Sequence, residues 1–171
     1  MHARCCAIYV QDGLNPTEDI VDKVRDGVKY IAASKSRRIK FAEIFKSLGL
    51  KCKKLILDVP TRWNSTYNML ECAIQFKTFF LLYRTSDPGF KEYVPGVEDW
   101  EQVEGVCSFL KVFSDVTKVV FGTGYSTSNL FLSEIRRVKH IIDKKAIDPN
   151  MHVREMARKM KLKFEKYWRE N

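Results

Sequence analysis

The sequence has few of the residues that mark fibrous, low-complexity or disulfide-stabilised proteins. Its 171 residues include only eight glycines and five prolines, too few for a collagen-like or low-complexity chain. The five cysteines form no Cys-x-x-Cys pair, and the three histidines show no zinc-finger spacing relative to them. We therefore expect no disulfide framework, no metal, no cofactor, and a reducing intracellular setting.

Long apolar runs and familiar catalytic motifs are also missing. The longest nearly apolar stretch, residues 76–83, contains Lys77 and is far too short to span a bilayer. The first residues lack the apolar region of a signal peptide. There is no glycine-rich phosphate loop, no His-Glu-x-x-His and no Gly-x-Ser-x-Gly. These absences predict a soluble protein with no membrane partner and no small-molecule substrate.

Positive charge and large apolar side chains are what the chain does have. Thirty lysines and arginines face 21 acidic residues, which gives a formal net charge of +9. An excess of this size predicts an anionic partner. The 11 Phe, 7 Tyr and 3 Trp residues exclude a disordered chain and supply material for a core.

Helical periodicity runs through most of the chain. Apolar residues first recur at helical spacing from Ile20 to Ile31. Similar patterns follow at residues 41–48, 65–86, 100–122, 128–142 and 153–167. By contrast, the apolar run before Pro60 is short and predicts a buried strand. The sequence therefore predicts a mainly α fold with one short strand near residues 53–58.

The segment after this strand is the first candidate site. Arg62 can make bidentate contacts with a phosphate or a base edge, and Trp63 can stack on an unpaired base. An alternative reading is purely structural. In that reading Asn64 or Ser65 caps the next helix, Trp63 packs into the core, and Arg62 pairs with Asp58.

A basic run between residues 35 and 54 is the second candidate site. Its cations are Lys35, Arg37, Arg38, Lys40, Lys46, Lys51, Lys53 and Lys54. Glu43 is its one acid, and phosphate-binding surfaces have this composition. A solvated helix face explains the same pattern. The last helix is also basic. Its apolar stripe already explains why it forms an amphipathic helix, so the structural interpretation is favoured there.

Residues 55–70, LILDVPTRWNSTYNML, carry a family resemblance. They resemble the signature of hAT-superfamily transposases, in particular the plant zinc finger BED domain-containing, RICESLEEPER-like group. Flanking stretches resemble the same family, namely residues 4–7, 10–14, 99–101 and 109–110, and residues 127–168 resemble its RNase-H-fold segment. The resemblance covers nearly the whole chain.

The resemblance implies an RNase H-like α/β core interrupted by a large all-α insertion. Residues 1–63 would be a remnant of that core, and residues 64–171 would belong to the inserted region. Family members cut DNA with three metal-binding carboxylates. By resemblance, two of these lie before Cys5 and the third after Asn171, so we expect no strand cleavage by this chain alone.

The predicted function is DNA binding by a fragment of a hAT-like transposase in the nucleus, with homodimers formed by full-length relatives. The predicted DNA contacts are Arg62, Trp63, Arg37, Arg38, Lys40, Lys51, Lys53 and Lys54. Two alternatives stay open. One is a helical protein-interaction or structural module from a domesticated transposase, and the other is an active nuclease.

Overall fold

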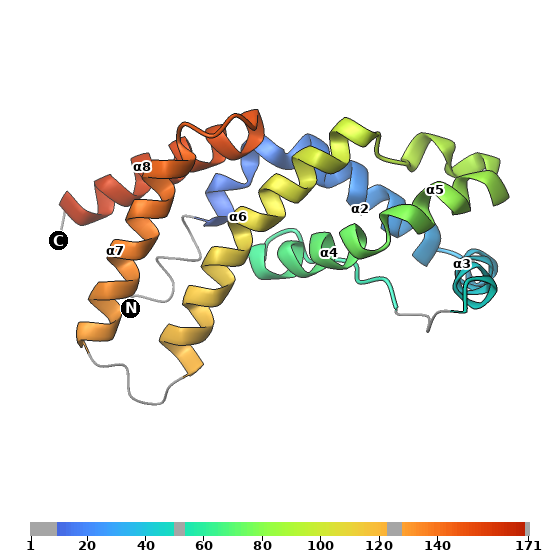
Figure 1. Ribbon diagram of the computed structural model, residues 1–171, viewed down its shortest axis with the longest axis horizontal. Coiled ribbons are helices and arrows are strands. Elements are labelled where there is room, and N and C mark those ends of the chain that lie inside the picture. The colour runs from blue at the N-terminus through green and yellow to red at the C-terminus, as the bar shows by residue number, and fades with distance from the viewer. Residues whose placement is uncertain (1–9, 50–53, 123–127, 170–171) are drawn as a thin grey trace.

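The protein is an elongated assembly of helices (Figure 1). The computed structural model describes residues 10–49, 54–122 and 128–169. Its elements are η1 (Asn15–Thr17), α2 (Glu18–Ala32), α3 (Lys35–Ser47), α4 (Trp63–Gln75), α5 (Lys77–Ser86), η2 (Pro88–Tyr93), α6 (Val97–Gly122), α7 (Ser128–Lys145) and α8 (Met151–Arg169), where η marks a 3-10 helix. The predicted mainly α fold is confirmed.

Several helix ends follow from local side-chain chemistry. Gly49, just beyond α3, has a φ of +68°, a backbone conformation that glycine adopts at little cost. The carboxylate of Asp87 accepts a hydrogen bond from the Gly89 amide at the start of η2. The side-chain oxygen of Asn150 accepts one from the Val153 amide at the start of α8. These contacts satisfy backbone groups that a helix terminus leaves unpaired.

The predicted strand at residues 53–58 is wrong for the part of it that the structure describes. Residues 54–59 form neither helix nor strand, and they pair with no strand in the described ranges. The segment instead runs antiparallel along α4. Its Lys54 carbonyl accepts a hydrogen bond from Cys72 near the end of α4, and Asp58 contacts Thr66 near the beginning. High strand propensity does not make a strand without a neighbouring strand to pair with.

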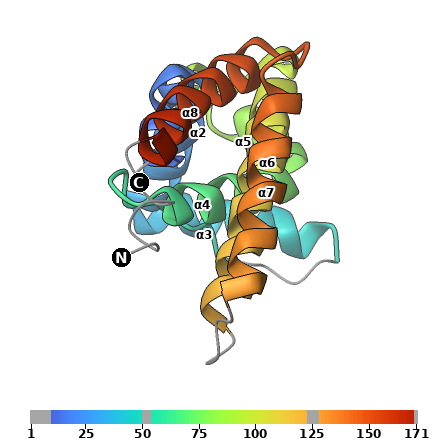
Figure 2. The same ribbon diagram turned by 90° about the vertical axis from the view of Figure 1, so that its left-hand side faces the viewer.

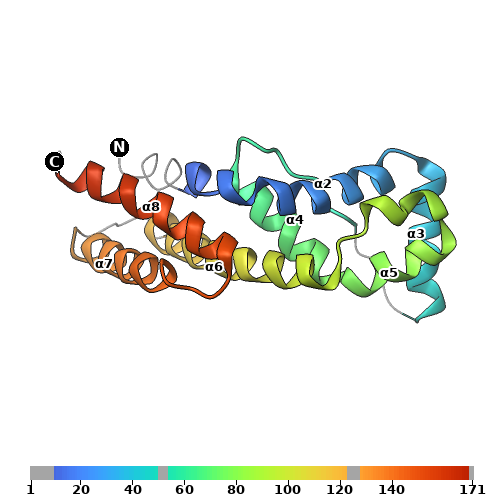
Figure 3. The same ribbon diagram turned by 90° about the horizontal axis from the view of Figure 1, so that it is seen from above.

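An aromatic cluster joins α3, α5, η2 and the start of α6. Its buried members are Phe41, Phe45, Phe76, Phe79, Phe80, Tyr83, Phe90 and Trp100. The rings of Phe45 and Phe79 stack with centroids 3.9 Å apart and planes only 6° apart. This cluster fixes α3 across one end of the molecule (Figure 3).

The long helix α6 connects the two halves of the structure. It packs against α4 on one side and against α7 and α8 on the other. Figure 2 shows α7 lying alongside α6, while α8 crosses back toward the N-terminal residues. One continuous core runs through both halves. The predicted division at residue 63 is not marked by a break in that core, and it stays a prediction.

Glycine at position 27 lets η2 approach α2. A Cβ atom at Gly27 would lie 2.9 Å from the Tyr93 backbone oxygen and 3.1 Å from the Phe80 ring. Since backbone cannot yield as a flexible side chain can, a larger residue here would push the two elements apart. Among the described helices, none is long and apolar enough to cross a membrane.

The first prediction concerns the stacked pair in the aromatic cluster. Replacing Phe45 with alanine leaves a cavity against Phe79, and we expect the free energy of unfolding to fall by about 3–5 kcal/mol. Ile39→Ala, at an exposed position of the same helix, is the control and should change it by less than about 0.5 kcal/mol. Urea unfolding followed by circular dichroism measures both. Equal losses would show that the cluster does not anchor α3.

Candidate nucleic-acid interface

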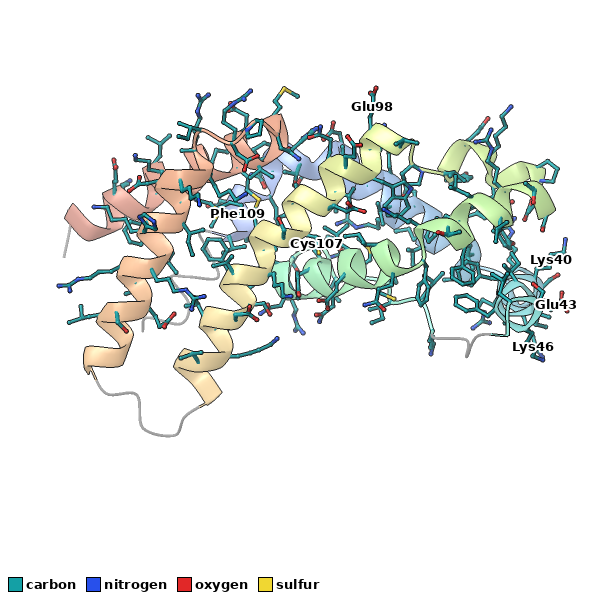
Figure 4. The ribbon with its side chains drawn as sticks, viewed as in Figure 1. Lys40, Glu43, Lys46, Glu98, Cys107 and Phe109 are labelled. Carbon is teal, nitrogen blue, oxygen red and sulfur yellow. The ribbon has the colours of Figure 1, made fainter. Side chains whose placement is uncertain are left out.

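Helix α3 presents exposed cations at one end of the molecule. Lys35, Arg38, Lys40 and Lys46 are all exposed on this helix. Figure 4 shows Lys40, Glu43 and Lys46 projecting outward from it. No described carboxylate lies within the 4.0 Å ion-pair distance of these four cations. Their charge is therefore available to an external anion.

Arg37 differs from its neighbours on α3 because it is already engaged. Its guanidinium carbon lies 3.7 Å from the centroid of the Tyr30 ring, and its Nη1 donates to the Tyr30 carbonyl at 3.2 Å. The Tyr30 ring stacks in turn on Tyr93, with centroids 4.8 Å apart. Arg37 thus fastens α3 to α2 through a cation–π contact. Of the predicted contacts on α3, Arg38 and Lys40 are the exposed ones.

The predicted pair Arg62 and Trp63 is divided between solvent and core. Arg62 is exposed, whereas Trp63 is only 4% exposed and packs in the core, as the structural alternative for this residue expects. The rest of that alternative differs from the structure. Helix α4 begins at Trp63 with no side-chain cap, and Asn64 and Ser65 lie inside its first turn. The Ser65 hydroxyl instead accepts a hydrogen bond from the Val59 amide at 2.9 Å.

A buried ion pair positions the whole segment before α4. The Asp58 side chain is 0% exposed and accepts hydrogen bonds from Nε and Nη2 of Arg25, each at 2.8 Å. Thr66 Oγ1 donates to the same carboxylate at 2.8 Å, and Asp22 contacts the outer Nη1 of Arg25. Asp58 therefore pairs with Arg25 of α2, and the alternative pairing of Asp58 with Arg62 is wrong.

Hydrogen bonding decides the protonation of this carboxylate. Burial raises the pKa of Asp58, but hydrogen bonds from Arg25 and Thr66 outweigh burial and hold the pKa below its usual range. The hydrogen bond that Arg25 donates to Asp58 raises the pKa of Arg25 against the opposing effect of burial. Both groups are therefore charged at neutral pH, and the pair satisfies both charges.

The predicted DNA contacts do not form one compact patch. Arg62 lies at the start of α4, and Lys54 lies near its end beside Cys72. From Trp63 to Cys72 the helix rises roughly 14 Å, at about 1.5 Å per residue. Helix α3 lies beyond that, at the end of the molecule (Figure 3). Lys51 and Lys53 fall outside the described residues.

Further exposed cations lie on α7 and α8. They include Arg136, Lys139, Lys144, Lys159 and Lys166. The basic character of α8 was visible in the sequence, whereas that of α7 was not predicted. Several neighbours on α8 are neutralised. Lys161 pairs with Asp143 at 2.7 Å, Arg158 pairs with Glu155 at 2.9 Å, and Lys163 pairs with Asp12. The free charge on α8 is thus smaller than its composition indicates, whereas that on α3 is undiminished.

The residues that the structure describes do not fit a two-metal catalytic site. Within residues 10–49, 54–122 and 128–169, no three His, Cys, Asp or Glu side chains are grouped closely enough to hold a metal ion. The buried carboxylate of Asp58 is occupied by Arg25 and Thr66. No catalytic step is therefore assigned to these side chains.

Comparison with known proteins identifies the family. Residues 2–109 match the model of a family described as the ZBED1 RNase-like helical domain. The chain belongs to this family. The observed helical fold agrees with that description, and the resemblance to RICESLEEPER-like proteins is confirmed by individual relatives.

Three relatives illustrate where this ZBED1-type helical domain occurs. The zinc finger BED domain-containing protein RICESLEEPER 2 of Oryza sativa subsp. japonica is 35% identical over 170 residues, which are 99% of this chain and 23% of the relative. A putative AC transposase of Zea mays is 34% identical, covering 98% and 22%. The protein DAYSLEEPER of Arabidopsis thaliana is 32% identical, covering 77% and 19%. The chain thus spans less than a quarter of each relative, and no solved structure matches it.

A second prediction tests the buried ion pair through its pH dependence. The folded-state pKa of Asp58 lies below its unfolded value, so its contribution to stability is present above about pH 4 and is lost as the pH falls through the folded pKa. Asp58→Asn should cost about 3–5 kcal/mol at pH 7, because it leaves Arg25 buried without its partner. Urea unfolding at pH 7 and pH 2.5 should show this difference shrinking at the lower pH.

The matched control for that experiment is Asp115→Asn. Asp115 is partly exposed, and its ion pair with Lys118 is long, at 3.8 Å. We expect its replacement to cost less than about 1 kcal/mol at either pH. A difference between Asp58→Asn and the parent that stays the same at both pH values would contradict the assignment.

Proposed function

We propose that this ZBED1-type helical domain binds DNA, with α3 as its main contact surface. The observation that carries this proposal is the set of exposed cations on α3, Lys35, Arg38, Lys40 and Lys46, which no described carboxylate neutralises. A relative named as a putative AC transposase adds support, since such a protein acts on DNA.

The proposed binding mode is electrostatic contact with the phosphate backbone. Cations on one helix face replace counterions condensed on DNA, and the entropy of counterion release drives association. Such contacts position a protein on a duplex without reading its sequence. Arg62 supplies a second, separate contact, because it is exposed beside the start of α4, where helix amides favour an anion.

We further propose that the chain does not cleave DNA on its own and that it acts in the nucleus. The first proposal rests on the resemblance, which assigns the catalytic carboxylates to positions outside this sequence. The proposal that the chain acts in the nucleus rests on its transposase-like relatives, because the DNA on which transposases act lies in the nucleus. Dimer formation by longer relatives is proposed on the resemblance alone.

A structural or protein-interaction module is the alternative function, and the burial of Trp63 favours it. A tryptophan that packs in the core cannot stack on a base unless α4 opens. The two functions differ in their dependence on salt. Binding to DNA weakens steeply as salt rises, whereas an apolar protein contact does not.

The third prediction tests α3 against another basic surface. Fluorescence anisotropy with a labelled 20-base-pair duplex, between 50 and 200 mM salt, gives the affinity and its salt slope. Removing three cations of α3 with Arg38→Ala, Lys40→Ala and Lys46→Ala should lower the slope by about 3 and the affinity at least tenfold. The control has the same charge change elsewhere, Lys144→Ala, Lys159→Ala and Lys166→Ala. Equal effects of the two triple variants, or binding independent of salt, would contradict the proposed surface.

A fourth prediction separates the two neighbouring arginines of α3. Arg37→Ala removes the contact with Tyr30, so we expect it to lower the free energy of unfolding by about 0.5–1 kcal/mol. Arg38→Ala should leave stability unchanged and weaken DNA binding more than Arg37→Ala does. Urea unfolding and the anisotropy titration measure the two effects. The reverse order of effects would show that Arg37 releases Tyr30 to bind DNA.

A further inference from the structure

We propose that an exposed stripe of α3, formed by Ser36, Ile39, Glu43 and Ser47, reads base edges in the major groove of duplex DNA. In this stripe Glu43 accepts a hydrogen bond from the amino group of a cytosine, and Ile39 contacts the methyl group of a nearby thymine. The inference rests on the proposed DNA binding by α3. It adds a sequence preference, which phosphate contacts alone do not supply.

The four residues of the stripe lie along one side of α3. They stand at positions i, i+3, i+7 and i+11, which an α-helix brings onto one face, and all four are exposed. Phe41 and Phe45 are buried on the opposite side, each about 160° around the helix from Glu43. The stripe therefore points away from the body of the protein.

Cations border the stripe on both sides. Lys40 precedes Glu43 by three residues and Lys46 follows it by three, so the two lysines lie about 60° to either side of Glu43. Figure 4 shows Glu43 between Lys40 and Lys46, with all three projecting outward from α3. Lys35 lies on the same side as Lys46. A helix in the major groove has phosphates on both of its sides, and cations placed in this way match them.

Glu43 is the only acidic residue of α3, and its carboxylate is free to accept a hydrogen bond. No described cation lies within 4.0 Å of it. An acid close to phosphates weakens binding, because like charges repel, so a surface that only bound the backbone would bind more tightly without it. A cytosine amino group offers the donor that a carboxylate accepts, which gives Glu43 a role in discrimination.

Ile39 supplies an apolar contact at a matching distance. Its side chain is 49% exposed and lies one turn before Glu43, about 6 Å along the helix axis. Successive bases of one DNA strand are about 3.4 Å apart. The thymine methyl group is the apolar feature that base pairs display in the major groove. Ile39 and Glu43 together therefore predict a cytosine and a thymine within about two base pairs of each other.

The size and place of α3 suit insertion into this groove. Its 13 residues span about 20 Å, and an α-helix with side chains is about 10–12 Å across, close to the groove width of about 12 Å. Figure 3 shows α3 lying across one end of the molecule, where it packs against α2 and α5. Duplex RNA has a major groove too deep and narrow to admit a helix, so the proposal is confined to DNA.

The experiment begins by selecting the preferred sequence. The full chain, at 150 mM salt, selects from a pool of 20-base-pair duplexes in which the central ten base pairs are randomised. We expect enrichment of a cytosine with a thymine within about two base pairs. Fluorescence anisotropy then compares the selected duplex with two altered forms. Changing the cytosine–guanine pair to thymine–adenine should weaken binding at least about fivefold, and changing the thymine to uracil, which removes only a methyl group, about twofold.

Glu43→Gln tests the carboxylate through the ratio of two affinities. Because it removes a negative charge near the phosphates, it should tighten binding to the duplex in which the cytosine is replaced. The preference for the selected duplex should disappear or reverse, since glutamine pairs with adenine. If both affinities rise equally and their ratio is kept, Glu43 only opposes phosphates and the proposal is overturned. Glu98→Gln, at an exposed acid near the start of α6, is the matched control and should leave the ratio unchanged.

Ile39→Ala tests the apolar contact separately. It should abolish the difference between the thymine and uracil duplexes while keeping the preference for cytosine. Both substituted positions of α3 are exposed, so neither variant should unfold, and circular dichroism checks this. Salt-dependent binding through α3 without an enriched cytosine overturns this inference and leaves the proposed function intact. Absence of DNA binding overturns both.

Discussion

The arrangement of this domain depends on one buried ion pair. Arg25 of α2 donates two hydrogen bonds of 2.8 Å to Asp58, in the segment before α4, and Thr66 of α4 donates a third. Helix α2, the segment before α4 and α4 itself meet at this carboxylate. Burying two charges costs desolvation energy, so this pair need not stabilise the fold more than an apolar contact would. What it adds is a fixed orientation, because a guanidinium and a carboxylate pair through two hydrogen bonds in one geometry. That orientation sets how the segment enters α4.

Most of the fold could be predicted because helices are recorded locally in the sequence. Apolar residues at helical spacing predicted the helices that the structure shows. The strand prediction failed because Leu55 to Leu57 satisfies the propensity of a strand, whereas strand pairing requires a partner elsewhere. The burial of Arg25 was not predicted either, although its position in the helical pattern indicated it. Arg25 stands four residues after Val21, on the face that Val21, Val24 and Val28 bury.

Less of the candidate site could be predicted, because a sequence shows charges without showing which of them are neutralised. Arg37 and Arg38 are equivalent in composition, yet only Arg37 lies over the Tyr30 ring, a contact across seven residues and a helix junction. The cations of α8 looked as numerous as those of α3, but acids from α7 and the N-terminal residues neutralise part of them. Trp63 illustrates the same limit, since it belongs to a core whose members range from Val10 to Phe164.

The buried ion pair also explains why an apolar segment stays at the surface. Ile56 and Leu57, each 45% exposed, would lower their free energy by folding into the core, and a freely hinged segment would do so. Asp58 prevents this movement, because drawing the segment inward would separate its carboxylate from Arg25 and leave two buried charges unpaired. That cost exceeds the gain of about 1 kcal/mol from burying the rest of each half-exposed side chain. The pair that holds α2 and α4 together therefore also keeps Ile56 and Leu57 at the surface.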